Sequence, residues 1–334
     1  MIKNEAESTV GAVVIGRNEG ERLRKCLGSL ADLPCPVVYV DSGSQDGSPG
    51  LARSMGAEVV ELDPGLPFTA GRGRNEGLAR ALAKNPEVEA VQFLDGDCEL
   101  VPGWLERGRA ELGSDPGLAA VCGRVREANR HASIYNRLCD MEWDAPPGET
   151  RSCGGNVLMR VAAFREVGGF RPGFIAGEEP ELCLRLRASG WHIRRLSDDM
   201  VRHDAAMIRF AQWWRRARRA GWAYAAGAAA HGASRERHNV REVRSIILWG
   251  GLLPVAALGL AVPSGGASLL LLGGFPLLWV RVRASGLSRG YGRGDAGLLA
   301  TFTVLAKVPQ FLGVSGFLLE KISRRRRGAL DWRG

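Results

Sequence analysis

The sequence predicts an α/β protein with a mostly parallel sheet, helices on both faces of that sheet, and a C-terminal helical membrane region. Two observations predict this class. Short apolar runs of strand length alternate with helix-type segments over roughly the first two hundred residues, a pattern typical of parallel sheets. Long apolar stretches then lie between clusters of arginine in about the last ninety residues.

The predicted strands and helices follow one another at short intervals. Strands are expected at 10–15, 37–40, 57–62 and 91–94, and the helices between them contain Leu23–Leu30, Leu51–Met55 and Gly71–Leu82. The first two strands end in small and acidic residues, as the fourth does. Because the carboxyl ends of parallel strands bind ligands in open α/β sheets, we expect these residues at one functional edge.

The fourth strand stops at two carboxylates, Asp95 and Asp97, which are separated by Gly96. Carboxylates at this spacing can share one hard divalent cation, and such ions usually also bind substrate phosphates. An Asp-Gly turn without any metal is the alternative, since Asp tolerates turn geometry.

Arginine and glycine dominate the start of the helix that precedes this strand. Arg72 and Arg74 lie there beside Asn75, so backbone amides and two guanidinium groups suit an anionic diphosphate. A flexible glycine turn followed by a solvated basic face is the alternative.

The charge, the N-terminal residues and the cysteines indicate which partners the protein binds and in which compartment it lies. The net charge of +9, mostly arginine in the second half, suits anionic lipid or phosphate, and no nucleic-acid-binding motif accompanies it. The polar start MIKNEAESTV lacks an apolar signal region, so export is not expected. Seven cysteines without metal-type spacing indicate reduced thiols in a cytoplasmic domain; they are Cys26, Cys35, Cys98, Cys122, Cys139, Cys153 and Cys183.

Four motifs in order resemble the family 2 glycosyltransferases with the GT-A fold. They are the segment Val40–Ser48, the helix start Arg74–Gly77, the acids Asp95-Gly96-Asp97, and the acidic segment Gly177–Leu186. Cys153-Gly154-Gly155-Asn156 followed by Phe164–Phe170 resembles the segment that shapes the acceptor side. The resemblance covers roughly residues 10 to 203 and implies transfer of a sugar from a nucleotide-sugar to a hydroxyl, with inversion.

The resemblance assigns residues to the donor and to a metal. Asp41 would accept from the base imide, with Asn18, Glu19 and Ser42 beside the base and ribose, although Asp41 also suits an Asx-turn. Asp95 and Asp97 would hold Mg²⁺ or Mn²⁺ against the diphosphate. His203 is a third candidate ligand, or a structural histidine.

The same resemblance places the catalytic base in the acidic segment. Glu179 occupies the position where Asp is usual, and Glu178 is the alternative base; both also suit the first turn of a helix for electrostatic reasons alone. Glu181 and Arg185 are expected to form a surface ion pair at i, i+4.

The second half predicts a membrane region. Residues 207–224 interleave aromatic residues with arginines, which favours an interfacial helix or a cap on the active site. Residues 246–262 and 267–280 carry no charge and have arginines only at their outer ends, so a hairpin with both ends in the cytoplasm is expected, either spanning or re-entrant. Residues 298–319 contain Lys307 and Pro309, which indicates an interfacial or broken helix.

Together these features predict an inverting, metal-dependent glycosyltransferase at the inner face of the plasma membrane. Its donor would be a UDP- or GDP-sugar, its acceptor a lipid-linked sugar or surface polysaccharide precursor, and its other partner membrane lipid rather than nucleic acid. A sugar-phosphate nucleotidyltransferase and a non-catalytic membrane scaffold are the alternatives. The expected divisions are a polar tail (1–8), a catalytic domain (9–205), interfacial helices (206–244), the hairpin (245–282), and a loop, helix and basic tail (283–334).

Overall fold

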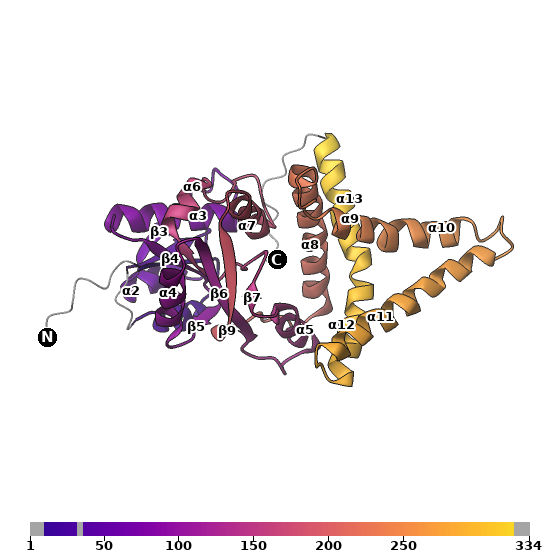
Figure 1. Ribbon diagram of the computed structural model, residues 1–334, viewed down its shortest axis with the longest axis horizontal. Coiled ribbons are helices and arrows are strands. Elements are labelled where there is room, and N and C mark those ends of the chain that lie inside the picture. The colour runs from indigo at the N-terminus through magenta and orange to yellow at the C-terminus, as the bar shows by residue number, and fades with distance from the viewer. Residues whose placement is uncertain (1–9, 32–35, 324–334) are drawn as a thin grey trace. The chain divides into compact units, whose positions relative to one another are not determined.

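The computed structural model describes residues 10–31 and 36–323 (Figure 1). The expectations for the N-terminal tail, for Cys35 and for the basic run Arg324–Arg327 concern residues outside these ranges. The chain forms two compact units. The first comprises residues 1–129 and 142–205, and the second comprises residues 130–141 and 206–334.

The first unit is built on one mixed sheet of nine strands in the order β3-β2-β1-β4-β8-β6-β9-β5, with β7 pairing with β9. Strands β1 to β4 are parallel, whereas β8, β5 and β7 run against their neighbours. The strands are β1 (Val10–Gly16), β2 (Val37–Asp41), β3 (Glu58–Glu61), β4 (Ala90–Asp95), β5 (Cys98–Leu100), β6 (Leu118–Glu127), β7 (Gly148–Glu149), β8 (Val157–Arg160) and β9 (His192–His203).

Helices connect the strands of the first unit, as the alternating apolar runs predict. They are α1 (Glu21–Gly28), α2 (Ser48–Ser54), α3 (Ala70–Lys84), α4 (Trp104–Ser114), α6 (Val161–Glu166) and α7 (Glu178–Ala188). The N-cap of α3 is Thr69, whose hydroxyl accepts from the backbone N–H of Arg72 at 3.1 Å. This cap fixes where α3 begins, and therefore where its arginines lie.

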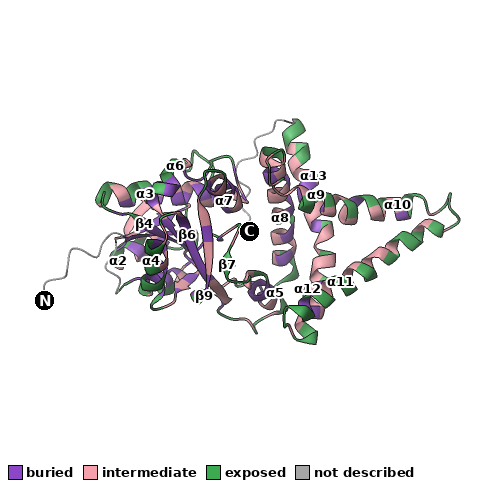
Figure 2. Ribbon diagram, in the orientation of Figure 1, coloured by how far each residue is buried: buried purple, intermediate pink, exposed green. Residues whose placement is uncertain are grey.

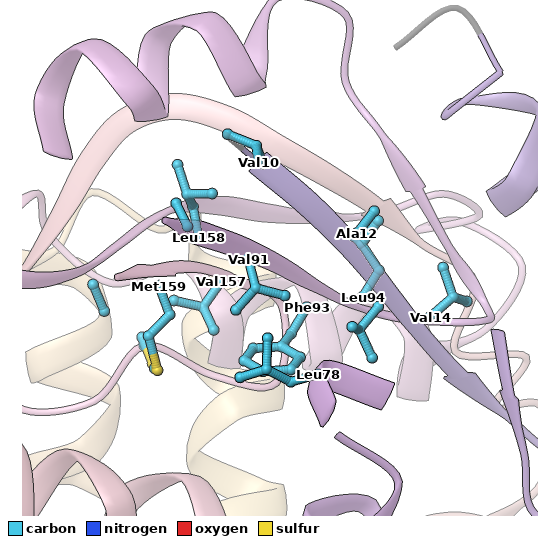
Figure 3. Packing of buried hydrophobic residues seen from close by; sticks show 14 of the residues in the cluster. Val10, Ala12, Val14, Leu78, Val91, Phe93, Leu94, Val157, Leu158 and Met159 are labelled. Atoms are coloured by element: carbon cyan, nitrogen blue, oxygen red, sulfur yellow. The ribbon is translucent and has the colours of Figure 1, made fainter. Parts of the chain in front are cut away.

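The core of the first unit lies between the sheet and these helices. Side chains of β1, β4 and β8 interdigitate there with Leu78 of α3 (Figure 3). Gly77 allows α3 to approach the sheet, because a Cβ built at this position would collide with Val13 and Val40. The core therefore packs α3 closely against the sheet, and both α3 and β4 carry candidate site residues.

The second unit is helical. Its elements are α5 (Ile134–Trp143), α8 (Phe210–His231), α9 (Val240–Ile247), the π-helical turn Leu248–Leu252, α10 (Leu253–Gly259), the 3₁₀ turn Ala267–Gly273, α11 (Gly274–Ser288), α12 (Arg293–Leu305) and α13 (Lys307–Ser323). The last two residues of α5, Glu142 and Trp143, belong to the first unit. Within the part of the chain that the structure describes, three stretches are long and apolar enough to cross a membrane: Val240–Gly259, Ala267–Ser288 and Arg293–Ile322.

Candidate active site

The carboxyl ends of β1, β2 and β4 meet at one edge of the sheet. Gly16 pairs with Asp41, and Ile15 pairs with Asp95, so both acids lie level with the end of β1. This placement follows from the parallel register and agrees with the edge that the sequence predicts.

The loops after β1 and β2 form the part of this edge assigned to the nucleotide. The side chain of Asn18 accepts from the backbone N–H of Gln45 at 2.8 Å, and the hydroxyl of Ser44 accepts from the N–H of Asn18 at 2.8 Å. Glu19 is buried and pairs with Arg22 at 2.7 Å. The N–H of Ser42 donates to the carbonyl of Gly16. The two loops are thus held together as one surface.

Asp41 is buried and forms an Asx-turn, the arrangement expected as its alternative role. Its Oδ2 accepts from the backbone N–H groups of Gly43 and Ser44 at 2.9 and 2.7 Å, and its Oδ1 accepts from the Tyr39 hydroxyl at 2.9 Å. A carboxylate offers about four acceptor positions, so these three contacts leave room for one more donor.

The two arginines of α3 have separate environments. The guanidinium of Arg72 pairs with Glu76 at 2.6 Å and donates to the carbonyls of Asp63 and Leu66, so it orders the loop before α3. Arg74 is buried and bridges two acids, with Nη2 2.8 Å from Asp95 and Nη1 3.3 Å from Glu178.

Arg74 therefore joins the two predicted acidic motifs. Burial alone would lower the pKa of its guanidinium, but the two carboxylates outweigh that effect and raise the pKa. Next to it, the Asn75 side chain donates to the carbonyl of Phe170 at 2.7 Å and accepts from its N–H at 3.0 Å. Asn75 thus fixes the turn that follows α6.

Asp97 and His203 face each other across the β5–β9 hydrogen-bonded pair. The Nε2 atom of His203 lies 3.3 Å from Oδ1 of Asp97. The ring of Trp143 packs edge-to-face against the imidazole, with the two ring centroids 4.5 Å apart. Burial alone would lower the pKa of His203, whereas Asp97 raises it, and the net direction is upward. Nδ1 of His203 is buried and has no hydrogen-bond partner among the described residues.

Of the three predicted metal ligands, Asp97 and His203 lie close together, and Asp95 lies beside them. Asp97 and His203 lie within reach of one ion, with the buried Cys98 thiol behind them. The carboxylate of Asp95, at the end of the same strand, is held by Arg74 through Oδ1. A Cβ at Gly155 would collide with the guanidinium of Arg74 and lie 3.1 Å from Oδ2 of Asp95, so a larger residue there would displace this ion pair.

Glu179 lies in a buried cluster with two thiols. Its Oε1 accepts from the backbone N–H of Cys153 at 2.6 Å, from the Cys153 thiol at 3.3 Å and from the Cys183 thiol at 2.9 Å. The contact with the Cys183 sulfur at 3.5 Å and burial raise the pKa of Cys153, and burial raises that of Cys183, so both thiols keep their protons. These donors orient the Glu179 carboxylate.

The expectation that Glu181 and Arg185 form a surface pair is wrong. Glu181 is 0% exposed, and Arg185 holds it through two bonds of 2.9 and 2.7 Å. Arg185 also donates to the carbonyls of Val167 and Gly169, because α7 packs this face against the turn after α6. Helical spacing predicted the pair but not its burial.

Two further residues at this edge were not singled out by the sequence. Asn156 accepts from the backbone N–H of Asp95 at 2.9 Å and so fixes the end of β4. Its place in the Cys153–Asn156 motif was a signal for it. Trp143, which packs on His203, had no sequence signal.

Known proteins resemble the part of the chain that forms this edge. Residues 12–168 match the model for "Glycosyl transferase family 2", and residues 139–208 match that for "N-terminal domain of galactosyltransferase". Residues 12–168 are therefore similar to a glycosyltransferase family 2 domain. The first match includes β1, β2, α3 and the acids Asp95 and Asp97.

Two glycosyltransferases are similar to this chain in sequence. The chain is 26% identical to glycosyltransferase AglE of Haloferax volcanii, over 59% of this chain and 67% of that protein. It is 29% identical to the pre-mycofactocin glycosyltransferase of Mycobacterium tuberculosis, over 58% of this chain and 42% of the relative, so it spans less than half of that protein.

The fold is also that of a solved glycosyltransferase. The structure of the mannosyltransferase PcManGT from Pyrobaculum calidifontis, in complex with GDP-Man and Mn²⁺, superposes with a TM-score of 0.59 at 20% identity, over 91% of this chain and 87% of that chain. The likeness shows the GT-A fold, as the four motifs predict.

Proposed function

We propose that this chain is a metal-dependent, inverting glycosyltransferase that acts at a membrane. It would move a sugar from a UDP- or GDP-sugar to a hydroxyl of a lipid-linked sugar or surface polysaccharide precursor. The observation that carries the proposal is the convergence of Asp95, Asp97, His203 and Glu178 at one sheet edge of a family 2 domain.

The spacing of Asp97 and His203 fits a divalent ion. Neighbouring ligands around an octahedral ion with bonds of about 2.1 Å lie about 3 Å apart, and these two ligand atoms are 3.3 Å apart. Asp97 and His203 would hold the ion, and Asp95 would lie beside it. Bound Mg²⁺ or Mn²⁺ would neutralise charge on the departing nucleoside diphosphate. The Mn²⁺ in the PcManGT structure agrees with this choice.

Glu179 is the proposed base. Its carboxylate accepts the proton of the acceptor hydroxyl as that oxygen attacks the anomeric carbon opposite the diphosphate, whose bond to the sugar breaks. Glu178 is the alternative base: its Oε1 pairs with Arg74, whereas Oε1 of Glu179 accepts from Cys153 and Cys183. Asn18, Glu19, Asp41 and Ser42 line the proposed base and ribose subsite.

The diphosphate would lie at the start of α3. Arg74 acts there as a positioning residue for Asp95, and Arg72 orders the adjacent loop.

Charge distribution supports a cytoplasmic catalytic unit. Arg241 and Arg244 precede the uncharged hairpin and Arg281 and Arg283 follow it, so both ends carry the positive charge typical of the cytoplasmic side. Nucleotide-sugar donors would then reach the site from the cytosol, and the acceptor would come from the inner (plasma) membrane.

Ligand-dependent thermal stability tests the donor site. UDP, GDP, CDP and dTDP are each added with and without Mn²⁺, and we expect one nucleotide to raise the melting temperature only with the metal. Asp97→Asn should abolish this shift. Asp199→Asn is the matched control, because this exposed acid lies on the strand of His203 and pairs with Arg126 at 2.9 Å. No stabilisation by any nucleotide would contradict the proposal.

The base is tested with the nucleotide-sugar that corresponds to the stabilising nucleotide. Glu179→Gln should abolish release of the nucleoside diphosphate while sparing its binding. Unchanged release would assign the base elsewhere, with Glu178→Gln as the next variant.

A further inference from the structure

The hairpin of the second unit consists of two apolar arms joined by the turn at residues 260–266. One arm contains the π-helical turn and α10, and the other contains the 3₁₀ turn and α11 (Figure 1). No residue from 245 to 280 carries a charge. In the second arm, no residue from Ala267 to Val280 is buried, and Figure 2 shows both arms mostly exposed or intermediate.

Several large side chains near the end of the hairpin have no protein cover. Val262 is 91% exposed and Leu270 is 82% exposed, although both are apolar. Exposed apolar residues that gather in this way mark a surface that contacts lipid or another protein.

Interfacial anchors occur at only one end of the hairpin. Trp249 lies near the start of the first arm and Trp279 near the end of the second, with Arg244 and Arg281 outside them. Trp249 packs on Phe275 of the opposite arm at 5.6 Å. The turn at residues 260–266 has no tryptophan, tyrosine or charged residue. A segment that crosses a bilayer usually has anchors at both interfaces.

The parts of the two arms that lie beyond their tryptophans are short for a crossing. From Trp249 to Leu260 the helix rises about 17 Å at 1.5 Å per residue. From Ala267 to Trp279 the combined 3₁₀ and α-helical rise is about 22 Å. The hydrocarbon layer is about 30 Å thick, so neither arm reaches the far interface when its tryptophan lies at the near one.

The turn satisfies its own hydrogen bonds. The N–H groups of Ser264 and Gly266 donate to Leu260 and Ala261 at 3.0 and 2.7 Å. The Ser264 hydroxyl donates to the carbonyl of Leu260 at 2.6 Å, and the Ser268 hydroxyl donates to that of Ala257 at 2.7 Å. Internal pairing of this kind is what hydrocarbon demands of backbone and hydroxyl groups.

The third apolar stretch has a different environment within the same unit. Helix α13 packs against α8, where a Cβ at Gly313 would collide with the carbonyl of Arg218 and one at Gly221 with that of Gln310. Helix α8 also carries Arg215, Arg216 and Arg219. A helix in such close contact with an arginine-rich neighbour suits the membrane surface rather than the hydrocarbon.

We infer that the hairpin is a re-entrant anchor, which enters the lipid bilayer from the side of the arginines, ends within the hydrocarbon and returns. The chain would then touch one aqueous compartment only. The inference rests on the membrane association proposed above and decides between the spanning and re-entrant forms left open by the sequence.

Cysteine accessibility in vesicles of purified lipid tests the inference. Full-length Val262→Cys, in the turn, and Ser285→Cys, exposed on α11 beyond the apolar arm, are reconstituted into phosphatidylethanolamine–phosphatidylglycerol vesicles. In one experiment a membrane-impermeant maleimide is added only outside the vesicles. In a second experiment, freezing and thawing the vesicles with the reagent places it both outside and in the lumen. Mass spectrometry of the modified peptide separates these cysteines from the native ones.

We expect Ser285→Cys to react without detergent and Val262→Cys to react only after detergent, even with reagent on both sides. Reaction of Val262→Cys only when the lumen contains reagent would overturn the inference in favour of a spanning hairpin. Reaction with external reagent alone, or failure of the protein to float with the vesicles, would overturn the membrane association itself. None of these outcomes depends on sugar transfer, which nucleotide binding tests separately.

A charged substitution provides a second measurement. Val262→Lys should weaken flotation with vesicles, because a re-entrant turn would carry the charge into hydrocarbon. Unchanged flotation would contradict a buried turn, and Ser285→Lys is the matched control.

Discussion

Replacing Arg74 by methionine should destabilise the first unit strongly. The guanidinium is buried between Asp95 and Glu178, at 2.8 and 3.3 Å. Removing one partner of a buried ion pair costs about 3–5 kcal/mol, because the remaining charge is left uncompensated. We expect a loss of unfolding free energy at the lower end of this range, about 3 kcal/mol, because the Asp95 side chain is 30% exposed and partly hydrated.

Thermal denaturation of the purified chain measures this effect. At about 2–4 °C per kcal/mol for a domain of this size, the melting temperature should fall by about 6–12 °C. Arg80→Met is the matched control, since Arg80 lies on the same helix but pairs with Glu58 at the surface, with its side chain 45% exposed. Such a pair contributes at most about 1 kcal/mol.

A second substitution separates charge from packing. Adding Glu178→Gln to Arg74→Met removes one uncompensated carboxylate, so the double variant should be more stable than Arg74→Met alone. A melting temperature for Arg74→Met within about 2 °C of the unaltered protein would refute the reasoning.

Three other predictions concern burial and close packing. Glu181→Ala should cost about 3 kcal/mol in thermal denaturation, because it leaves the Arg185 guanidinium, 13% exposed, without its carboxylate; a loss below about 1 kcal/mol would contradict a buried pair. Burial raises the pKa of Cys122 to about 12, so the folded protein should resist alkylation there at pH 8, whereas the urea-unfolded chain should react. Equal rates of Cys122 alkylation in the folded and the unfolded chain would contradict the burial of this thiol. Gly221→Leu should lower the melting temperature of the helical unit, because a side chain there meets the carbonyl of Gln310; an unchanged transition would show that α8 and α13 do not touch at this point.

Much of the sheet could be predicted because its strands are short apolar runs with clear ends. The expected strands at 10–15, 37–40, 57–62 and 91–94 differ from β1 to β4 by at most one residue at each end. The sequence did not predict the positions of the later strands in the sheet. Strands β8 and β6 are inserted between β4 and β9 and run in opposite directions to each other. Nothing in the local pattern of apolar residues specifies that arrangement.

The sequence alone determined which residue types occupy the candidate active site at the sheet edge and which stretches of the chain have no charged residue. Acids at the ends of buried strands must lie at one edge once the strands are parallel, and an uncharged stretch flanked by arginines favours lipid regardless of its partners. These properties are local, since they depend on neighbours along the chain.

Only the tertiary structure decided which acids are paired and which are oriented by other groups. Arg74 meets Glu178 across 104 positions of sequence, Cys153 meets Glu179 across 26, and Asn156 meets Asp95 across 61. Helical spacing likewise placed Glu181 beside Arg185, but packing of α7 buried the pair. Contacts between distant segments depend on how helices and strands pack, and that packing sets the burial and partners that give each carboxylate its role.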